Sequence, residues 1–391
     1  MRALVAVLLS AVLVGCSTSA PKTAPTPVGR EFPAPAVAAL DDGQAAAKLQ
    51  AVLDEVVALF KTTPGAETAA RGVTAAVIVG DRWSWTGAAG ADALGETLRP
   101  STEMATASIT KTFVAAEVLR LAEAGRIDLN APLSRYVKHR LTANGATVRQ
   151  YLAMTAGVPD FLPSDYEKMA KDLAGAPARR WTARQALKYH TSAPRKPGSP
   201  YSYSNASYLL VGMAIEAVTK KPLALALRND LVKPAGLRRI AFQDGERPQE
   251  PIAGSKSEVC GTIPDGFIPC RSVASSSAAA GSMAADAATV ARWGYQLYGA
   301  RVLPAAIVDQ LISGSPSGSS EYGLGTMRFS STLGPLGDAF GHRGNAPGYT
   351  SLLAVIPTRR LSVAVLLADG NKNVDAVMTK FLTALAPLVQ G

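Results

Sequence analysis

A serine followed three residues later by a lysine opens a run of apolar residues at helical spacing. Ser108 and Lys111 precede this run, which extends from Val114 to Leu121. Residues three apart on a helix lie on one face, so we expect both side chains on one wall of a pocket. Unpaired amides and the positive dipole end of the helix would favour negative charge developing at Ser108, as nucleophilic attack requires. Taken alone, this spacing is more typical of a capped surface helix with a solvated lysine.

A polar, turn-prone segment further along the chain carries two more groups that can do chemistry. Tyr203 and Asn205 lie two residues apart on it, and an apolar helical pattern from Leu209 to Val218 follows. The Tyr203 phenol can shuttle a proton if a nearby cation lowers its pKa, and the Asn205 amide can donate to a substrate carbonyl. The alternative for this stretch alone is a tyrosine-rich capped loop.

His342 stands in a glycine-rich stretch that leads into a strand pattern. Gly341 and Gly344 would let the backbone approach a ligand closely. An unperturbed histidine titrates near pH 6.5, so a catalytic His342 predicts a rate limb in that region, which His342→Lys would remove. A lone loop histidine is more often structural than catalytic.

The chain that must position these groups has strand patterns at both ends and helical patterns in the middle. We therefore expect one sheet built from both ends, with a helical insert, and a site at the seam between the two parts. The patterns are a helix at 44–61, a hairpin at 73–79 and 83–88, a helical insert at about 108–300, strands at 349–356 and 361–367, and a closing helix at 374–388.

In this order, S-x-x-K, Y-x-N and H-x-G resemble the motifs of the penicillin-recognising serine hydrolases, which include D-Ala-D-Ala carboxypeptidases, class C β-lactamases and related esterases. Segments 148–160, 201–219 and 281–297 also resemble the family, and Tyr322-Gly323-Leu324-Gly325 precedes the third motif as expected. The resemblance implies the β-lactamase/transpeptidase-like fold. This fold has an α/β part, with an antiparallel sheet flanked by helices, and an inserted all-helical subdomain.

The resemblance also implies acyl transfer through an acyl-serine. Ser108 would be the nucleophile, and burial and neighbouring cations would lower the pKa of Lys111 so that it can exchange a proton. Tyr203 would relay that proton to the leaving group, and which of the two is the acylation base stays open. His342 stands where many relatives have lysine. The backbone amides of Ser108 and Asn345 would form the oxyanion hole, worth about 3–4 kcal/mol for one donor.

The positions expected to bind substrate are Asn205, Gly344, Arg343 and Arg328. The bacterial carboxypeptidase that this chain most resembles binds a terminal carboxylate with threonines beside H-x-G and an arginine after Y-G-L-G. Here Arg343 precedes the glycine, and Met327 takes the position of the arginine. Successive side chains of a strand face opposite ways, so Arg328 is not an automatic substitute, whereas Arg343 can bind a carboxylate in a bidentate manner.

These expectations favour a serine acyl hydrolase of the D-Ala-D-Ala carboxypeptidase type, acting on a peptidoglycan peptide or a related amide. A carboxylesterase of the same family is the alternative if Arg343 points away from the pocket. A penicillin-binding envelope module with little turnover is the alternative from another class. True β-lactamase activity is less expected, because the sequence offers no fast deacylation route that we can identify.

The N-terminus predicts a location outside the cytoplasm. Residues 1–15 have a basic start and an apolar core too short to span a bilayer, as in a signal peptide. Their end resembles a lipobox, so we expect lipidation of Cys16 to anchor the chain to the bacterial cell membrane. Residues 16–40, rich in Pro, Ala and Thr, would then be a tether to a hydrolase domain at 41–391. The alternative is an ordinary secreted protein with a chance cysteine.

The remaining cysteines and the charge limit the partners. Cys260 and Cys270 are an even pair and are expected to form a disulfide in an oxidising compartment. Their spacing does not suit zinc, and no metal or phosphate-loop motif is present, so we expect neither a metal nor a cofactor. The formal charge is +10 but is scattered, without the basic run of a nucleic-acid face. We expect a small peptide or ester substrate, a membrane contact through Cys16, and no nucleic acid.

Overall fold

The computed structural model describes residues 31–389, except for 64, 67, 255–259, 261–265, 314–320, 331 and 371. The predicted signal peptide, Cys16 and residues 16–30 of the predicted tether therefore lie outside the described residues. Within the described ranges, no helix combines the length and the apolar character that crossing a bilayer requires.

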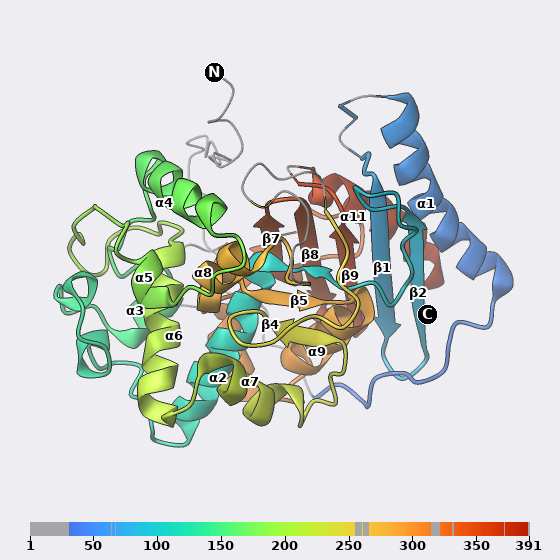
Figure 1. The fold of residues 1–391 in the computed structure, drawn as a ribbon. Helices are drawn as coiled ribbons and strands as arrows, with labels where there is room; N and C mark the ends of the chain where they lie inside the picture. The colour runs from blue at the N-terminus through green and yellow to red at the C-terminus, as the bar shows by residue number, and fades with distance from the viewer. Residues whose placement is uncertain are drawn as a thin grey trace.

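A six-stranded antiparallel sheet is built from both ends of the chain (Figure 1). Its strands are β1 (Gly72–Val79), β2 (Trp83–Gly90), β6 (Met327–Phe329), β7 (Ala339–Ala346), β8 (Tyr349–Ile356) and β9 (Leu361–Leu367). The order across the sheet is β2-β1-β9-β8-β7-β6. The predicted N-terminal hairpin and the two predicted C-terminal strands are confirmed as the pairs β1–β2 and β8–β9.

The central strands are buried on both faces, which explains their nearly continuous apolar sequences. In β1, Val73 and Val77 face one apolar core, whereas Ala76 and Ile78 face the other. The same alternation occurs in β8 and β9. Two layers of helices are therefore needed to cover the sheet.

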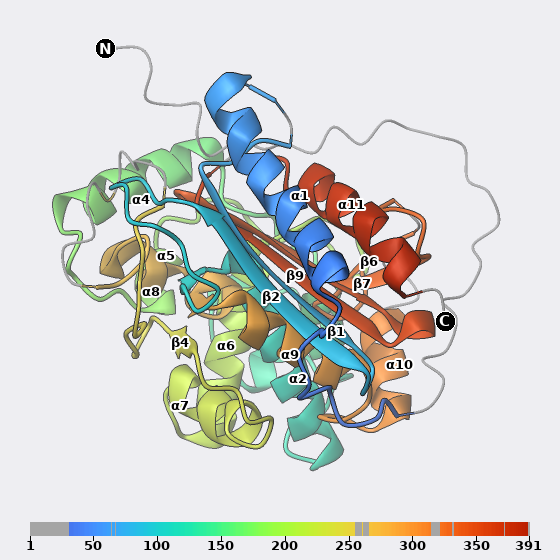
Figure 2. The ribbon, with the colours of Figure 1, turned by 90° about the vertical axis from the view of Figure 1, so that its right-hand side faces the viewer.

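Helices α1 (Gly43–Thr62) and α11 (Val374–Leu385) cover one face of the sheet and lie side by side on it (Figure 2). The Asp42 carboxylate caps α1 by accepting hydrogen bonds from the Gln44 and Ala45 amides. Both helices fall where the apolar spacing predicted them, at 44–61 and 374–388, and a 3-10 turn continues the second one.

The helical part packs on the other side of the sheet. Its helices are α2 (Thr110–Glu123), α3 (Val148–Leu152), α4 (Pro163–Gly175), α5 (Ala183–Ala186), α6 (Asn205–Thr219), α7 (Leu223–Leu227) and α8 (Arg271–Gly281), and α9 (Ala287–Tyr298) and α10 (Ala305–Ser313) follow. Although α9 falls within the predicted insert, it packs directly on β1, β8 and β9. Gly294 permits this approach, because a Cβ there would lie 2.5 Å from Leu353. The predicted antiparallel sheet flanked by helices, with an inserted helical part, is confirmed.

A second, three-stranded sheet was not predicted. It consists of β3 (Met104–Ala105), β5 (Met283–Ala285) and β4 (Ile240–Phe242), in that order. Strands of two or three residues are too short for an alternating pattern to reveal. This sheet fixes the chain just before Ser108, where the Thr106 amide donates to the Met283 carbonyl at 3.0 Å.

The described end of the predicted tether differs from an extended linker. The Phe32 side chain is buried and packs on the Tyr295 ring, with ring centroids 5.0 Å apart. The amides of Ala36 and Leu40 donate to the carbonyls of Gly80 and Ser84. Residues 31–40 therefore lie against the domain rather than leading away from it.

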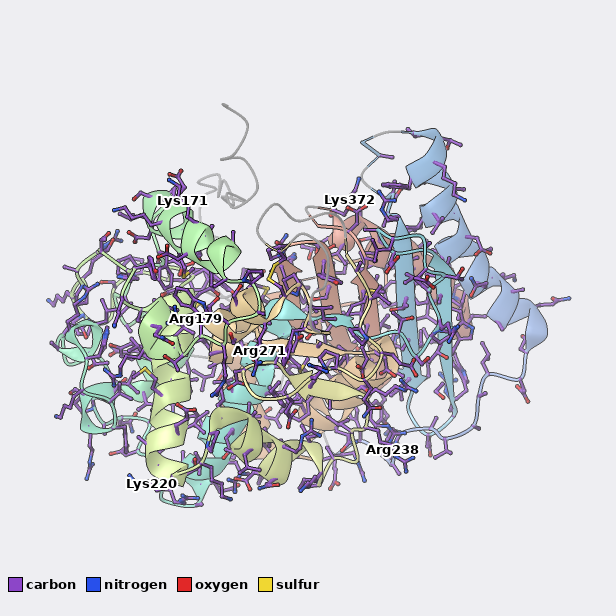
Figure 3. All side chains as sticks on the ribbon, in the orientation of Figure 1. Lys171, Arg179, Lys220, Arg238, Arg271 and Lys372 are labelled. Atoms are coloured by element: carbon purple, nitrogen blue, oxygen red, sulfur yellow. A yellow bond between two sulfur atoms is a disulfide. The ribbon has the colours of Figure 1, made fainter. Side chains whose placement is uncertain are left out.

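The predicted disulfide is confirmed, since Cys260 and Cys270 are bonded with their Cα atoms 5.6 Å apart. The basic side chains labelled in Figure 3 are widely spread, from Lys171 on the helical part to Lys372 beside the sheet. Their distribution agrees with a scattered positive charge rather than a single basic face.

Phe381 on α11 provides a test of the layer that covers the sheet. Its ring is fully buried and lies 5.6 Å from the Trp85 ring. Phe381→Ala should lower the free energy of unfolding by about 3–5 kcal/mol, because it leaves a cavity beneath α11. Urea unfolding followed by circular dichroism measures this, with the exposed Thr383→Ala as the control. A loss below about 1 kcal/mol would mean that α11 is not a structural layer.

Candidate active site

Ser108 lies in a 3-10 turn, Ala107–Ile109, that leads directly into α2. Its side chain is partly exposed, whereas Thr106, Ala107 and Ile109 are buried. Ala107 adopts a left-handed backbone conformation with φ of +47°, which is unusual for a residue with a side chain. This turn presents the Ser108 hydroxyl at the start of α2, close to the position that the sequence predicted.

Lys111, in the first turn of α2, is the most fully buried charged group near Ser108. Its relative exposure is 0%, and its amine makes three short contacts. Nζ lies 2.9 Å from Ser108 Oγ, 2.9 Å from Asn205 Oδ1 and 2.6 Å from the Ala280 carbonyl oxygen. The structure therefore places Ser108 and Lys111 together. The Ala280 carbonyl, which no sequence pattern indicated, is a further partner of the amine.

Burial lowers the pKa of Lys111 from 10.5 to about 7, because an ammonium loses its hydration there. The expected cause was wrong in part, since no neighbouring cation among the described residues contributes. The neighbouring charge that acts on Lys111 is the Asp160 carboxylate, which raises the pKa. Near neutral pH the amine is thus poised between its two protonation states.

The contacts of Lys111 suit both protonation states. As an ammonium, it can donate one hydrogen to each of its three partners. As a neutral amine, it can still donate to Asn205 and Ala280, while its lone pair accepts the Ser108 hydroxyl hydrogen. Deprotonation of Lys111 therefore reverses one hydrogen bond and turns the amine into a base for Ser108.

Tyr203 contacts the same hydroxyl from the loop before α6. Its OH donates to Ser108 Oγ at 2.9 Å, and Lys111 Nζ lies 5.0 Å from its ring centroid. Burial raises the pKa of Tyr203, so the expectation that a nearby cation would lower it is wrong. Tyr203 is a neutral phenol that can pass a proton on, rather than a phenolate.

Asn205 opens α6 and uses its whole amide within the protein. Its Oδ1 accepts from Lys111, and its Nδ2 donates to Asp160 Oδ2 at 3.0 Å and to Tyr166 OH at 3.2 Å. The role expected for Asn205, donation to a substrate carbonyl, would require one of these bonds to open. Asp160 and Tyr166 were not among the predicted site residues. Asp160 ends a segment that resembles the family, but only the fold brings it to Asn205.

His342 lies on β7 and is fully buried. Its Nδ1 lies 2.5 Å from the Arg343 carbonyl oxygen, which can only accept, so Nδ1 carries the proton. Nε2 then accepts from the Tyr322 hydroxyl at 3.2 Å. Burial, assisted by Lys111, lowers the pKa of His342 to about 3. A neutral, buried imidazole does not support the predicted rate limb of His342 near pH 6.5.

The glycine of the third motif lets β7 approach the serine turn. A Cβ on Gly344 would lie 2.2 Å from the Thr106 carbonyl oxygen and 2.2 Å from Ser351 Oγ. Strand β6 pairs with β7 only from Ala339 to Gly341, so the segment that contains Gly344 and Asn345 extends past the end of β6. Asn345 lies on this segment with an exposed side chain, and the role predicted for its backbone amide stays a prediction.

Both arginines predicted to bind a substrate carboxylate are held by aspartates. Arg343 binds Asp375 of α11 in a bidentate manner, with Nε 2.7 Å from Oδ1 and Nη2 2.5 Å from Oδ2. Arg328 Nη2 lies 2.6 Å from Asp338 Oδ2. His342 precedes Arg343 on β7, so their side chains project to opposite faces of the sheet. Neither guanidinium is an uncompensated cation facing Ser108.

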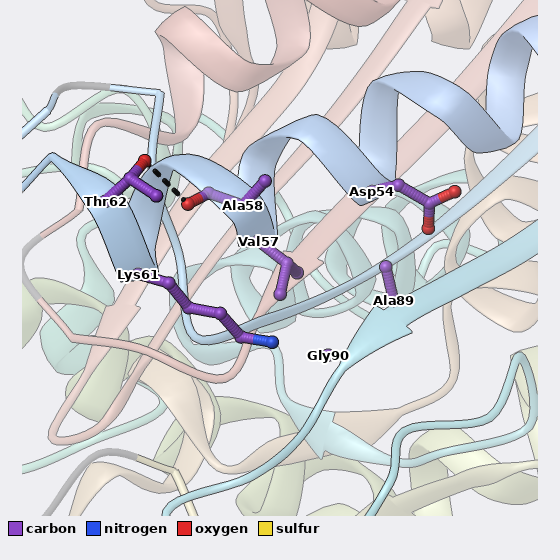
Figure 4. A pocket seen from close by; sticks show the side chains of 7 residues that line it. All are labelled: Asp54, Val57, Ala58, Lys61, Thr62, Ala89 and Gly90. Carbon is purple, nitrogen blue, oxygen red and sulfur yellow. Dashed lines mark hydrogen bonds between the residues drawn. The ribbon is translucent and has the colours of Figure 1, made fainter.

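A groove on the described part of the chain lies apart from this site. A groove between α1 and β2 is lined by Val57, Ala58 and Ala89, with Asp54 and Lys61 at its rim, and it lies on the opposite face of the sheet from Ser108 (Figure 4). Among the described residues, no cluster of His, Cys, Asp and Glu has the composition to hold a metal ion.

Comparison with known proteins places this chain in a family. The model of the family described as "Beta-lactamase" matches residues 46–387. The chain belongs to the Beta-lactamase family. Within it, the contacts among Ser108, Lys111 and Tyr203 are the arrangement of a serine hydrolase.

Similar proteins carry several different names. Protein flp of Staphylococcus aureus (strain COL) is 32% identical over 149 residues, which are 37% of this chain and 29% of that protein. Esterase EstB of Burkholderia gladioli is 33% identical over 165 residues, 39% of this chain and 41% of EstB. This chain thus aligns with less than half of either relative. The structure of a D-stereospecific amidohydrolase from Streptomyces sp. has a TM-score of 0.70 and 26% identity, and the match covers 86% of this chain and 99% of that one.

The lowered pKa of Lys111 predicts the pH dependence of acylation. Neutral Lys111 is the form that accepts the Ser108 proton, so kcat/KM for a neutral ester should rise with pH through about 7 and then level off. Stopped assays with p-nitrophenyl acetate at a series of pH values measure this limb. His342→Gln keeps an acceptor for Tyr322 and should leave the midpoint in place. If the limb disappeared in that variant, it would belong to His342 instead.

Proposed function

We propose that this chain is a serine acyl hydrolase that works through an acyl-enzyme on Ser108. The observation that carries this proposal is the position of Ser108 Oγ, 2.9 Å from both Lys111 Nζ and Tyr203 OH. A partly exposed hydroxyl that contacts a lysine with a pKa of about 7 can lose its proton near neutral pH. Membership of the Beta-lactamase family supports the same chemistry.

The proposed reaction has two halves. Neutral Lys111 takes the Ser108 proton as Oγ attacks the substrate carbonyl carbon, and the carbonyl oxygen becomes an oxyanion near the amides of Ser108 and Asn345. The proton then passes through Tyr203 to the leaving nitrogen or oxygen, and the bond to the leaving group breaks. In the second half, water attacks the acyl carbon and gives up a proton to the same groups. The bond from that carbon to Ser108 Oγ then breaks, Oγ takes the proton, and the carboxylic acid leaves.

We propose a neutral amide or ester as the substrate, rather than a peptide with a free terminal carboxylate. The arginines expected to bind that carboxylate are neutralised by Asp375 and Asp338. A carboxylate would therefore lose hydration in the site without gaining an uncompensated cation from either arginine, which is costly. The D-stereospecific amidohydrolase and the esterase among the similar proteins support the same substrate class.

We also propose that the enzyme acts at the outer face of the cell membrane, anchored by lipid on Cys16. The support is the lipobox-like sequence before Cys16 and the Cys260–Cys270 disulfide, which suits an oxidising compartment. Incorporation of labelled fatty acid that is lost in Cys16→Ser would establish the anchor, and full release of the unmodified protein into the medium would exclude it.

A matched pair of substrates tests the proposed specificity. An N-acyl-D-Ala-D-Ala with a free carboxylate and its C-terminal carboxamide differ only in the charge at one end. We expect the carboxamide to have a kcat/KM at least ~10-fold higher, because Arg343 and Arg328 are already paired with aspartates. Product formation by chromatography measures both. A clear preference for the carboxylate would restore the carboxypeptidase assignment and require an anion receptor.

Removal of the nucleophile tests the mechanism itself. Ser108→Ala should lower turnover of either substrate at least ~10³-fold while leaving the unfolding transition nearly unchanged, because the Ser108 side chain is small and partly exposed. Turnover that survived in this variant would place the chemistry elsewhere. If the wild-type chain bound these substrates without hydrolysing them, the chain would instead be an envelope binding module.

A further inference from the structure

A carboxylate that no motif contains lies behind the lysine of this site. Asp160 sits between α3 and α4, 45 residues before Asn205, and is partly buried. Its two oxygens face the first turn of α6 and the Tyr166 hydroxyl. Neither the serine nor the tyrosine of the motifs touches it.

Every polar neighbour of Asp160 can donate a hydrogen bond to it. Oδ1 accepts from the Asn205 amide at 2.9 Å and the Ala206 amide at 3.4 Å. Oδ2 accepts from Asn205 Nδ2 at 3.0 Å and from Tyr166 OH at 3.2 Å. An ionised carboxylate only accepts, whereas a protonated one would present a hydrogen to these donors. The positive end of the α6 dipole also favours the charged form. Burial raises the pKa of Asp160, but the donors around both oxygens and the charge of Lys111 oppose this effect, so the geometry favours a carboxylate anion here.

This anion determines which way the Asn205 amide points. Both Nδ2 hydrogens are committed to Asp160 and Tyr166, so Oδ1 must face Lys111, which it meets at 2.9 Å. If the amide were flipped, its hydrogens would point at the amine and its oxygen at the carboxylate. The Asn205 amide thus transmits the negative charge of Asp160 to the lysine as an aligned dipole.

The loop that carries Asp160 is held in place on its other side. The His190 ring lies with Nε2 2.8 Å from the Pro159 carbonyl oxygen, and Ser204 Oγ donates to the same oxygen at 3.3 Å. These bonds fix the residue directly before Asp160. Asp160 is therefore positioned by structure outside the three motifs.

We propose that Asp160 is a positioning residue that stabilises the protonated form of Lys111 through Asn205. Lys111 can then keep the proton that Ser108 gives up during acylation. This inference rests on the proposed function for its catalytic meaning. Its physical content, a charge that biases the protonation of Lys111, does not depend on turnover.

The other titratable groups that face Lys111 are neutral. Within the described chain, Asp160 is therefore the charged group that acts on Lys111. Tyr203 and Tyr208 lie with ring centroids 5.0 and 5.6 Å from Nζ, and burial raises the pKa of both phenols, so they stay neutral. His342 on β7 is neutral as well, since burial lowers its pKa. Tyr166 on α4 faces Asp160, and burial keeps it protonated.

The test reads the protonation of Lys111 directly. In protein labelled with ¹³C at lysine Cε, the resonance that Lys111→Met removes belongs to Lys111, and its titration gives a midpoint that we expect at about 7. Asp160→Asn should move this midpoint down by at least ~0.5 pH unit, because it removes the negative charge and releases the Asn205 amide to flip. The limb of the ester pH–rate profile should move with it.

Two further variants separate this role from a structural one. Asp286→Asn changes another buried aspartate, which caps α9 through the Thr289 amide at 2.7 Å, and should leave the Lys111 midpoint in place. The exchange Asp160→Asn/Asn205→Asp keeps one carboxylate and one amide but puts the charge next to Lys111. Its midpoint should rise above that of the wild-type chain, and this prediction holds as a test even if Asp160→Asn fails to fold.

An unchanged midpoint in Asp160→Asn, or a midpoint in the exchange variant at or below the wild-type value, would overturn the proposal and leave Asp160 as a helix cap. These outcomes are distinct from failure of the proposed function. A chain that hydrolyses no ester or amide but shows both shifts would refute the hydrolase assignment and keep the charge coupling.

Discussion

The burial of one amine governs the rest of this site. Lys111 lies at 0% exposure, and loss of hydration lowers its pKa to about 7, so it can be either a base or an acid at neutral pH. An isolated buried ammonium would be costly, and three acceptors limit that cost. Each acceptor comes from a different element: the serine turn, α6 and the end of α8. The fold brings these elements together around a single nitrogen.

Two backbone features make that arrangement possible. Ala107 turns the chain in a left-handed conformation so that Ser108 enters α2 with its hydroxyl at the pocket, and Gly344 lets β7 approach the same turn. The sheet holds β7 from one side, and the short sheet with β5 holds Thr106 from the other. The serine is therefore fixed at the boundary between the sheet and the helical part, where small displacements would break its 2.9 Å contacts.

Much of this structure followed from the sequence, because it depends on local patterns. Helical spacing located α1 and α11, alternating and apolar runs located β1, β2, β8 and β9, and the motif spacing brought forward Ser108, Lys111 and Tyr203. Effects of burial and of contacts between distant segments could not be predicted from the sequence. The neutral His342, the high pKa of Tyr203, the ion pairs of Arg343 and Arg328, and the carboxylate of Asp160 all depend on which groups the fold encloses together.

The central claim is that the Lys111 amine makes the Ser108 hydroxyl nucleophilic, and covalent trapping tests it most directly. After treatment with a fluorophosphonate, intact-mass analysis and peptide mapping should find one adduct, on Ser108. Lys111→Met replaces the amine with a side chain of similar length that suits burial, so the variant should fold but label at least ~10²-fold more slowly. An adduct on another residue, or equally fast labelling of Ser108 without the amine, would contradict the account.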